Sequence, residues 1–363
     1  MQRTTKILVA IVAVIAVAGV GTFAVLISST PPGNGCPSTK TAAANVLAQA
    51  PVSAPPPASR VNKAPGSGPD VASLSSGSVR TTISAASVIP VVAAENFWGS
   101  LVSQLGGNQT SVLSIVTDPN ADPHEYEANA SDATAVANAQ FVVVNGVGYD
   151  DWALQLIAAS NNPHQLVLNV GNLVGVSVTG GIVTGNPHMW YNPAYVNETV
   201  AAMYSALVSI RPSSAGYFQE NYATLNVSLG ELYGRANQIR AQFAGTEVAS
   251  TESIFVYLAN YTHLDLVSPP EFMQAIAEGN DPSAQSVVDF QCQLESGKVS
   301  VLVYNEQTVT PITSQMKLIA VEHNVSIVGV TETIQPSDVS FEVWMNSEYL
   351  QLQNALNAKA LGQ

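Results

Sequence analysis

The sequence predicts an α/β protein with two lobes, each a mostly parallel sheet flanked by helices, joined by one long backbone helix. Three observations support this fold: apolar runs alternating with helix-like stretches after residue 87, a division of these runs into two sets, and a long helical stripe between the sets. Continuous apolar strands separated by helices are typical of parallel sheets covered on both faces. At 363 residues the chain is long enough for two such lobes.

The strand-like runs divide the folded part of the chain into an N-terminal lobe, residues 88–212, and a C-terminal lobe, residues 246–363. The first lobe contains runs at 88–94, 110–116, 140–146 and 165–171, and the second has runs at 248–255, 264–269, 299–306 and 325–332. Helix-like stretches such as 283–296 and 312–323 separate them. Each set can therefore form one sheet.

Residues 213–245 form the predicted linking helix. Its apolar residues recur every three or four positions and make one stripe: Phe218, Tyr222, Leu225, Leu229, Leu232, Ala236, Ile239 and Phe243. At 1.5 Å per residue such a helix is roughly 40 Å long, which is enough to run along both lobes.

The N-terminus predicts export and tethering. Arg3 and Lys6 precede an uninterrupted apolar run at 7–27, so residues 1–28 are either a membrane anchor with a cytoplasmic positive end or a cleaved signal segment. Lipidation of Cys36 is a third alternative, although "GNGC" lacks the aliphatic residue expected three positions before a lipidated cysteine. Residues 29–87 are rich in Pro, Ser and Ala, which predicts a disordered linker.

Charge and cysteine content exclude two classes of protein. The net charge of −14 argues against nucleic acid as a partner, because phosphate binding needs clustered cations. Two cysteines in different regions make neither a disulfide framework nor a thiolate metal site. We expect Cys292 to be a small hydrophobic residue buried in a helix.

Four residues at the ends of predicted strands or in neighbouring loops are candidate metal ligands. His124 and His188 belong to the first lobe, whereas Glu252, within the first strand of the second lobe, and Glu332, at the end of its last strand, belong to the other. Ligands bind at the carboxyl ends of strands in open α/β sheets, so these residues can meet only across a cleft between the lobes. Two imidazoles and two carboxylates suit one divalent ion such as Zn²⁺ or Mn²⁺, and binding should weaken as pH falls through the histidine range. Taken singly, each residue has a simpler explanation: a histidine beside proline is usually a solvent-exposed loop residue, and a glutamate at a strand end, such as Glu332, often caps the next helix.

Residues 88–363 resemble the cluster A-I solute-binding proteins, which are the zinc- and manganese-binding receptors of bacterial metal ABC transporters. The resemblance is carried by "DPHEYE" at 122–127, "NPHMWYNP" at 186–193, "STESIF" at 250–255 and "VTET" at 330–333. It implies that His124, His188, Glu252 and Glu332 are the ligands, and that the metal is held between the lobes. Glu332 stands where the family usually has Asp, so the sequence does not set the denticity of Glu332. The Glu at position 252 is more typical of family members that bind manganese, but such sites also bind zinc, so the sequence does not distinguish zinc, manganese and iron.

The resemblance predicts an extracytoplasmic protein that captures a divalent metal ion and delivers it to the permease of an ABC transporter. We expect a monomer at the outer face of the cell membrane, held by its N-terminal helix or secreted after cleavage. We do not expect an enzyme, because a catalytic metal keeps an open position and the chain has no His-Glu-x-x-His motif. An exported metal-dependent adhesin and a metallohydrolase are the alternatives. Asp122, Glu127 and Asn186 are candidates for orienting the imidazoles.

Overall fold

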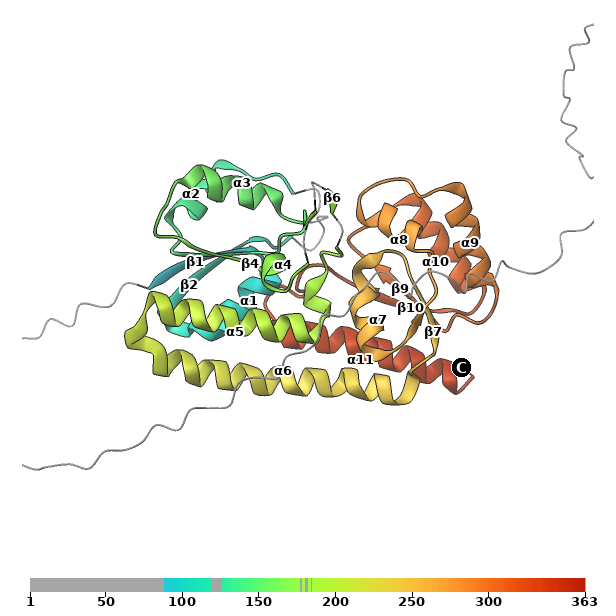
Figure 1. Ribbon diagram of the computed structural model, residues 1–363. Coiled ribbons are helices and arrows are strands. Elements are labelled where there is room, and N and C mark those ends of the chain that lie inside the picture. The colour runs from blue at the N-terminus through green and yellow to red at the C-terminus, as the bar shows by residue number, and fades with distance from the viewer. Residues whose placement is uncertain (1–87, 119–125, 177, 180–181, 184, 363) are drawn as a thin grey trace, which may run out of the picture. The chain divides into compact units, whose positions relative to one another are not determined.

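The computed structural model describes residues 88–118, 126–176, 178–179, 182–183 and 185–362 (Figure 1). The predicted N-terminal segment and linker, residues 1–87, therefore lie outside the described residues. Within the part of the chain that is described, no helix combines the length and the apolarity needed to cross a membrane. Both predicted lobes fall within one compact unit.

The first lobe is built on a sheet of four parallel strands in the order β2-β1-β3-β4. The strands are β1 (Ile89–Glu95), β2 (Thr110–Val116), β3 (Phe141–Val144) and β4 (Leu166–Asn169), and each falls within one residue of the start of a predicted run. In the register of this sheet, Val91 lies opposite both Val112 and Phe141.

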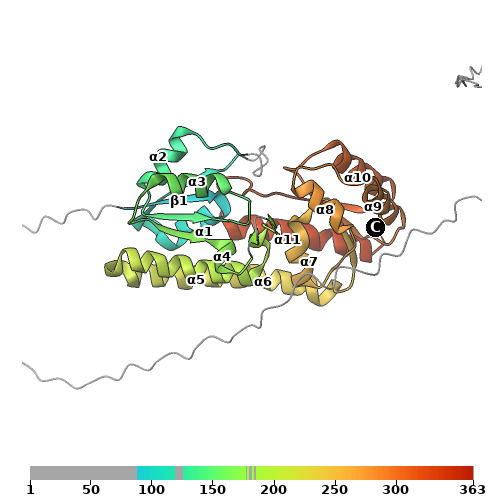
Figure 2. The ribbon, with the colours of Figure 1, turned by 45° about the horizontal axis from the view of Figure 1, so that its top comes forward.

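Helices cover both faces of this sheet (Figure 2). Val92 and Val142 pack with α2 (Ala130–Asn138) and α3 (Asp151–Ser160) on one face. Val91 and Val143 pack with α1 (Asn96–Gly106) and α5 (Pro193–Ile210) on the other. Because successive strand residues point to opposite faces and both faces are buried, the strands are apolar at nearly every position. The connection from β4 to α5 contains α4 (Val170–Leu173), the antiparallel pair β5 (Val178–Thr179) and β6 (Ile182–Val183), and the 3₁₀ helix η3 (Met189–Tyr191).

The second lobe repeats this architecture. Its four parallel strands have the order β10-β9-β7-β8, which read from β8 is the strand order of the first sheet. The strands are β7 (Glu247–Ser250), β8 (Asp265–Leu266), β9 (Val301–Asn305) and β10 (Ser326–Val330). One face packs on α8 (Pro270–Ala277), α9 (Ala284–Glu295) and α10 (Pro311–Glu322), and the other on α7 (Val256–Thr262) and α11 (Phe341–Ala360).

Two details of this lobe differ from the prediction. β7 ends at Ser250, because the chain turns into the 3₁₀ helix η5 (Ser253–Phe255), so Glu252 follows the strand instead of lying within it. β10 likewise ends at Val330, two residues before Glu332. The expectation that Cys292 is a buried small hydrophobic residue is wrong: this half-buried residue of α9 is disulfide-bonded, and its partner lies outside the described residues.

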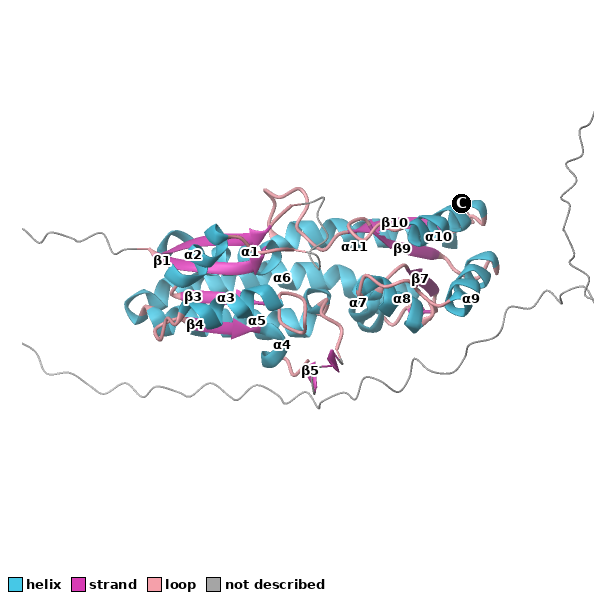
Figure 3. Cartoon of the chain, turned by 90° about the horizontal axis from the view of Figure 1, so that it is seen from above, coloured by secondary structure: helices cyan, strands magenta, loops and turns pink. Residues whose placement is uncertain are grey.

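The long helix α6 (Ala215–Phe243) confirms the predicted linker and runs beneath both sheets (Figures 1 and 3). Its apolar stripe is buried from Phe218 to Phe243, except that Tyr222 is half-buried and stacks on Tyr204 with ring centroids 4.8 Å apart. It packs against α1 and α5 of the first lobe and against α7 and α11 of the second, so one apolar core extends through both lobes.

The C-terminal helix α11, which the sequence analysis did not assign, packs along α6 and also reaches the first lobe. The Phe341 amide donates to Ser100 Oγ at 3.0 Å, and Gln104 Nε2 donates to Glu342 Oε2 at 3.0 Å. Ser100 and Gln104 belong to α1. The chain therefore passes to the second lobe through α6, returns to the first lobe before α11, and passes back to the second lobe along α11.

Candidate metal centre

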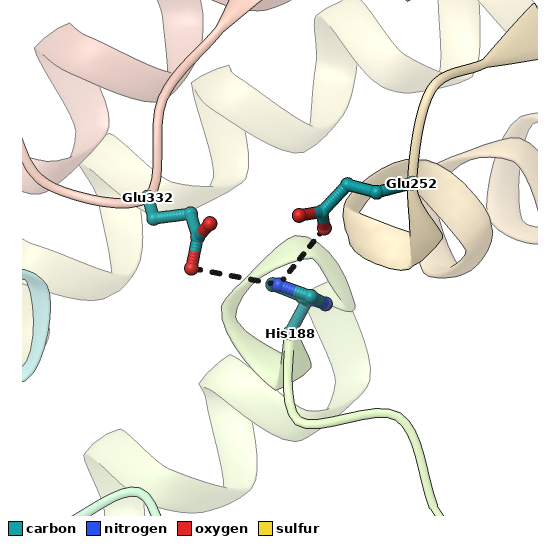
Figure 4. A group of neighbouring side chains, drawn as sticks. All are labelled: His188, Glu252 and Glu332. Atoms are coloured by element: carbon teal, nitrogen blue, oxygen red, sulfur yellow. Dashed lines mark ion pairs between the residues drawn. The ribbon is translucent and has the colours of Figure 1, made fainter. Parts of the chain in front are cut away.

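His188, Glu252 and Glu332 lie side by side although they are far apart in the sequence (Figure 4). All three are fully buried, and one ligand atom from each lies within 4.8 Å of the others. His188 Nε2 is 3.2 Å from Glu252 Oε1 and 3.6 Å from Glu332 Oε2. Ligands about 2.1 Å from a tetrahedral metal ion are about 3.4 Å from one another. The observed separations therefore match those of ligands that share one ion.

The fold explains how these residues meet. Glu252 follows β7 and Glu332 follows β10, so both carboxylates lie at the carboxyl edge of the second sheet. β7 and β9 are the neighbouring strands at which the strand order changes direction, which is where open α/β sheets bind ligands. His188 comes from the first lobe, where Asn145, directly after β3, donates its Nδ2 to the carbonyl of Pro187 at 2.9 Å.

The orientation of the His188 ring is set by Asn186. Asn186 Oδ1 accepts hydrogen bonds from the backbone N–H of His188 at 2.9 Å and from its ring Nδ1 at 2.8 Å. Asn186 Nδ2 in turn donates to the carbonyl of Ser253 in the second lobe at 2.6 Å. With the proton assigned to Nδ1 by this bond, Nε2 presents its electron pair to the two carboxylates.

Asn305, the last residue of β9, holds both carboxylates. Its Nδ2 donates to Glu252 Oε2 at 2.9 Å and to Glu332 Oε1 at 2.6 Å. The other oxygens of the pair, Glu252 Oε1 and Glu332 Oε2, face His188. Glu252 Oε1 also accepts from the Ile254 amide at 2.9 Å, and Glu332 Oε2 accepts from the Tyr149 hydroxyl at 2.8 Å. Each carboxylate therefore has one oxygen directed to Asn305 and one directed to the imidazole.

The surroundings of this cluster are buried and rich in acidic side chains. Burial, with the charge of Glu332 as the next cause, raises the pKa of Tyr149 well above its usual value, so its hydroxyl stays protonated and donates. Further from the cluster, burial and the charge of Asp150 raise the pKa of Glu95, and burial raises that of Asp150 to about 6. Both shifts favour the protonated form of these carboxyls.

The other residues singled out in the sequence have different surroundings. His124 and Asp122 lie outside the described residues, so the fourth predicted ligand remains a prediction. Glu127 is exposed, whereas Asn186 contacts the His188 ring.

Sequence reasoning missed Asn305 and Tyr149, which bond to the candidate ligands. Both follow or end a buried strand, Asn305 in "VLVYNEQ" and Tyr149 in "VVVNGVGYD". Polar residues at the carboxyl ends of the strands were the signal that would have found them.

These features define a two-lobed binding protein with a buried imidazole–carboxylate cluster between two parallel sheets. The model of the family described as "Zinc-uptake complex component A periplasmic" matches residues 91–355, and the chain belongs to this family. Members of the family are metal-binding solute-binding proteins and not enzymes.

Individual relatives are distant. The chain is 21% identical over 220 residues to a "Putative metal-binding protein" of Treponema pallidum, covering 55% of this chain and 66% of the relative. It is 27% identical over 144 residues to the "Manganese-binding lipoprotein MntA" of Halalkalibacterium halodurans, covering 40% of this chain and 47% of the relative. The match therefore spans about half to two thirds of the length of these relatives.

Among solved structures, the periplasmic zinc binding protein TroA from Treponema pallidum is similar in fold. The TM-score is 0.64 at 15% identity, with 74% of this chain and 99% of that chain covered. At this identity the likeness supports the two-lobed fold alone.

Proposed function

We propose that this protein binds a divalent transition-metal ion, Zn²⁺ or Mn²⁺, between its two lobes outside the cytoplasm and delivers it to the permease of an ABC transporter. His188, Glu252 and Glu332 are ligands from the described residues, and His124 is the fourth. The ion is cargo, and the protein catalyses no reaction.

One observation carries this proposal: three electron-pair donors converge in a fully buried place. His188 Nε2 and two carboxylate oxygens repel one another unless a cation lies among them or Nε2 takes a proton. Imidazole nitrogen and carboxylate oxygen are ligands that suit zinc and manganese. Family membership and the relatives named as metal-binding proteins also support it.

Division of the ligands between the lobes supports a route for release. His188 belongs to the first lobe, whereas Glu252 and Glu332 belong to the second. Separation of the lobes would withdraw both carboxylates together and leave the ion with imidazole ligands alone. We further propose that the protein acts as a monomer. It is either tethered at the extracytoplasmic face of the cell membrane through residues 1–28 or released from that membrane by cleavage.

Metal content of the full chain tests the proposal. The protein is purified in detergent without a metal-affinity tag, stripped with a chelator, and titrated with Zn²⁺ or Mn²⁺ against a competing chromophoric chelator, beside His188→Ala and His124→Ala. We expect one equivalent of metal in the wild type and a loss of affinity in both variants. A wild type that takes up no stoichiometric metal would refute the proposal.

A further inference from the structure

Glu348 of α11 is a buried carboxyl that bonds to two segments next to the candidate metal centre. Its Oε2 is hydrogen-bonded to the Tyr191 hydroxyl at 2.6 Å, and its Oε1 accepts from the Thr331 amide at 3.0 Å. Only 6% of the residue is exposed. A buried carboxyl is costly, so its retention in a helix face that is otherwise apolar calls for a specific role.

Both partners of Glu348 are close in sequence to candidate ligands. Tyr191 ends η3, the short helix that His188 caps, and it belongs to the first lobe. Thr331 immediately precedes Glu332 and belongs to the second lobe. One side chain therefore bonds to the His188 segment and to the Glu332 segment at once.

Hydrogen bonds from α11 to both lobes fix the position of the helix that carries Glu348. Trp344 lies one turn before Glu348 on the same face of the helix, and its Nε1 donates to Thr331 Oγ1 at 3.0 Å. At the start of the helix, the Phe341 amide is bonded to Ser100 of the first lobe. Glu348 therefore extends from a helix that is itself attached to both lobes.

The network is complete when Glu348 is neutral. Burial raises the pKa of Glu348 to about 8. A protonated Oε2 donates to the Tyr191 oxygen, and the Tyr191 hydroxyl then donates to the carbonyl of Thr331, which lies 3.3 Å away. Glutamine has the same donor and acceptor at its two ends, so it can replace the neutral acid in this network.

We propose that Glu348 is a positioning residue of the candidate metal centre, which sets the separation of His188 and Glu332 by holding Tyr191 and Thr331. This inference rests on the proposed function, because the separation of two ligands matters only if they share an ion. Glu348 acts through its two partners and is not itself a ligand.

The test measures release of Zn²⁺ from the loaded full chain, by stopped-flow mixing with excess EDTA, together with the zinc affinity. Four variants are compared with the wild type: Glu348→Ala, Glu348→Gln, Tyr191→Phe and the control Glu342→Ala. The control removes another carboxylate of α11 that accepts a bond from the first lobe, through Gln104, without contact to either ligand segment.

We expect Glu348→Ala to release zinc at least about tenfold faster than the wild type. Substitution of a group that orients metal ligands typically weakens metal binding by about 10–100-fold. Glu348→Gln should stay within about threefold of the wild type, because the amide restores both bonds. Tyr191→Phe, which loses only the hydroxyl and keeps its buried ring, should accelerate release about threefold or more. Glu342→Ala should leave release within about twofold of the wild type.

Two results overturn the inference alone, in a wild type that binds one zinc ion. In the first, Glu348→Ala releases zinc no faster than Glu342→Ala. In the second, Glu348→Gln releases zinc as fast as Glu348→Ala. If Glu348→Ala does not fold, Tyr191→Phe decides, and wild-type release from it overturns the inference. If the wild type takes up Mn²⁺ and not Zn²⁺, release of Mn²⁺ is measured in the same way and decided by the same outcomes. A wild type that binds neither ion refutes the proposed function and the inference with it.

Discussion

Replacing Asn305 by alanine should weaken metal binding without unfolding the protein. The Asn305 amide has two hydrogens and three oxygens within reach: Glu252 Oε2 at 2.9 Å, Glu332 Oε1 at 2.6 Å and Thr308 Oγ1 at 3.0 Å. The two carboxylates are the stronger acceptors. Alanine removes an amide that bonds to both of them, so the oxygens that face His188, Glu252 Oε1 and Glu332 Oε2, are held less firmly in that direction.

The size of the effect follows from these bonds. Hydrogen bonds to charged groups contribute about 1.5–3 kcal/mol each to stability, so the metal-free protein should lose about 2–4 kcal/mol after partial rearrangement. Loss of a group that orients metal ligands weakens metal binding about 10–100-fold, or about 1.4–2.7 kcal/mol. Because the variant binds the ion more weakly, the loaded protein should lose this binding free energy in addition to the stability lost by the metal-free protein.

The assay is a competition titration of the full-length variant with Zn²⁺, beside thermal unfolding of the metal-free protein. Asn280→Ala is the matched control, because Asn280 also donates to a carboxylate of the second lobe, Glu278 Oε2 at 3.4 Å, but at the exposed surface. An Asn305→Ala variant that binds zinc as tightly as the Asn280→Ala control would show that Asn305 does not orient the carboxylates.

Three further predictions follow from the same geometry. Glu252→Ala and Glu332→Ala should each lower zinc affinity at least about 100-fold while circular dichroism shows folded proteins, because each removes a ligand; unchanged affinity in both would remove the second lobe from the site. Zinc should bind more tightly than manganese in direct competition, since it stands higher in the Irving–Williams order, and a reversed order would point to a coordination sphere wider than four ligands. Glu348→Gln should gain stability over the wild type as pH rises from about 5 to about 8. Burial raises the pKa of Glu348 from its ordinary value of 4.5 to about 8, so the folded wild type loses stability across that window, up to a limit of about 5 kcal/mol. An equal stability difference between variant and wild type at pH 5 and at pH 8.5 would refute this prediction.

The strands and the linking helix were predictable from the sequence because their burial is simple. Strands such as 140–146 are covered on both faces, and the buried stripe of α6 follows the helical period almost without interruption. α11 was missed for a physical reason. Its buried face contains Glu348, while Val343 and Leu350 are exposed, so the apolar stripe that marks an amphipathic helix is broken.

The candidate site was predictable only in part. The sequence pattern named His188, Glu252 and Glu332 as candidate ligands that could meet only across a cleft between the lobes, and the structure brings these three together. The side chains that hold them are amides and hydroxyls, such as Asn305 and Tyr149, which are common in any loop. Their contacts span 53 residues from Asn305 to Glu252 and 183 from Tyr149 to Glu332, and no local pattern encodes such pairings.

The return of α11 to the first lobe has a consequence for synthesis. Ser100 and Asn96 of α1 find their partners, Phe341 and Ile334, only 241 and 238 residues later. Contacts this distant close slowly, because the entropy of a long loop is lost before any bond is gained. During synthesis, the sides of α1 and α6 that face α11 therefore stay exposed to solvent until α11 has been made. A chain truncated before residue 341 should remain prone to aggregation even when its first sheet is complete.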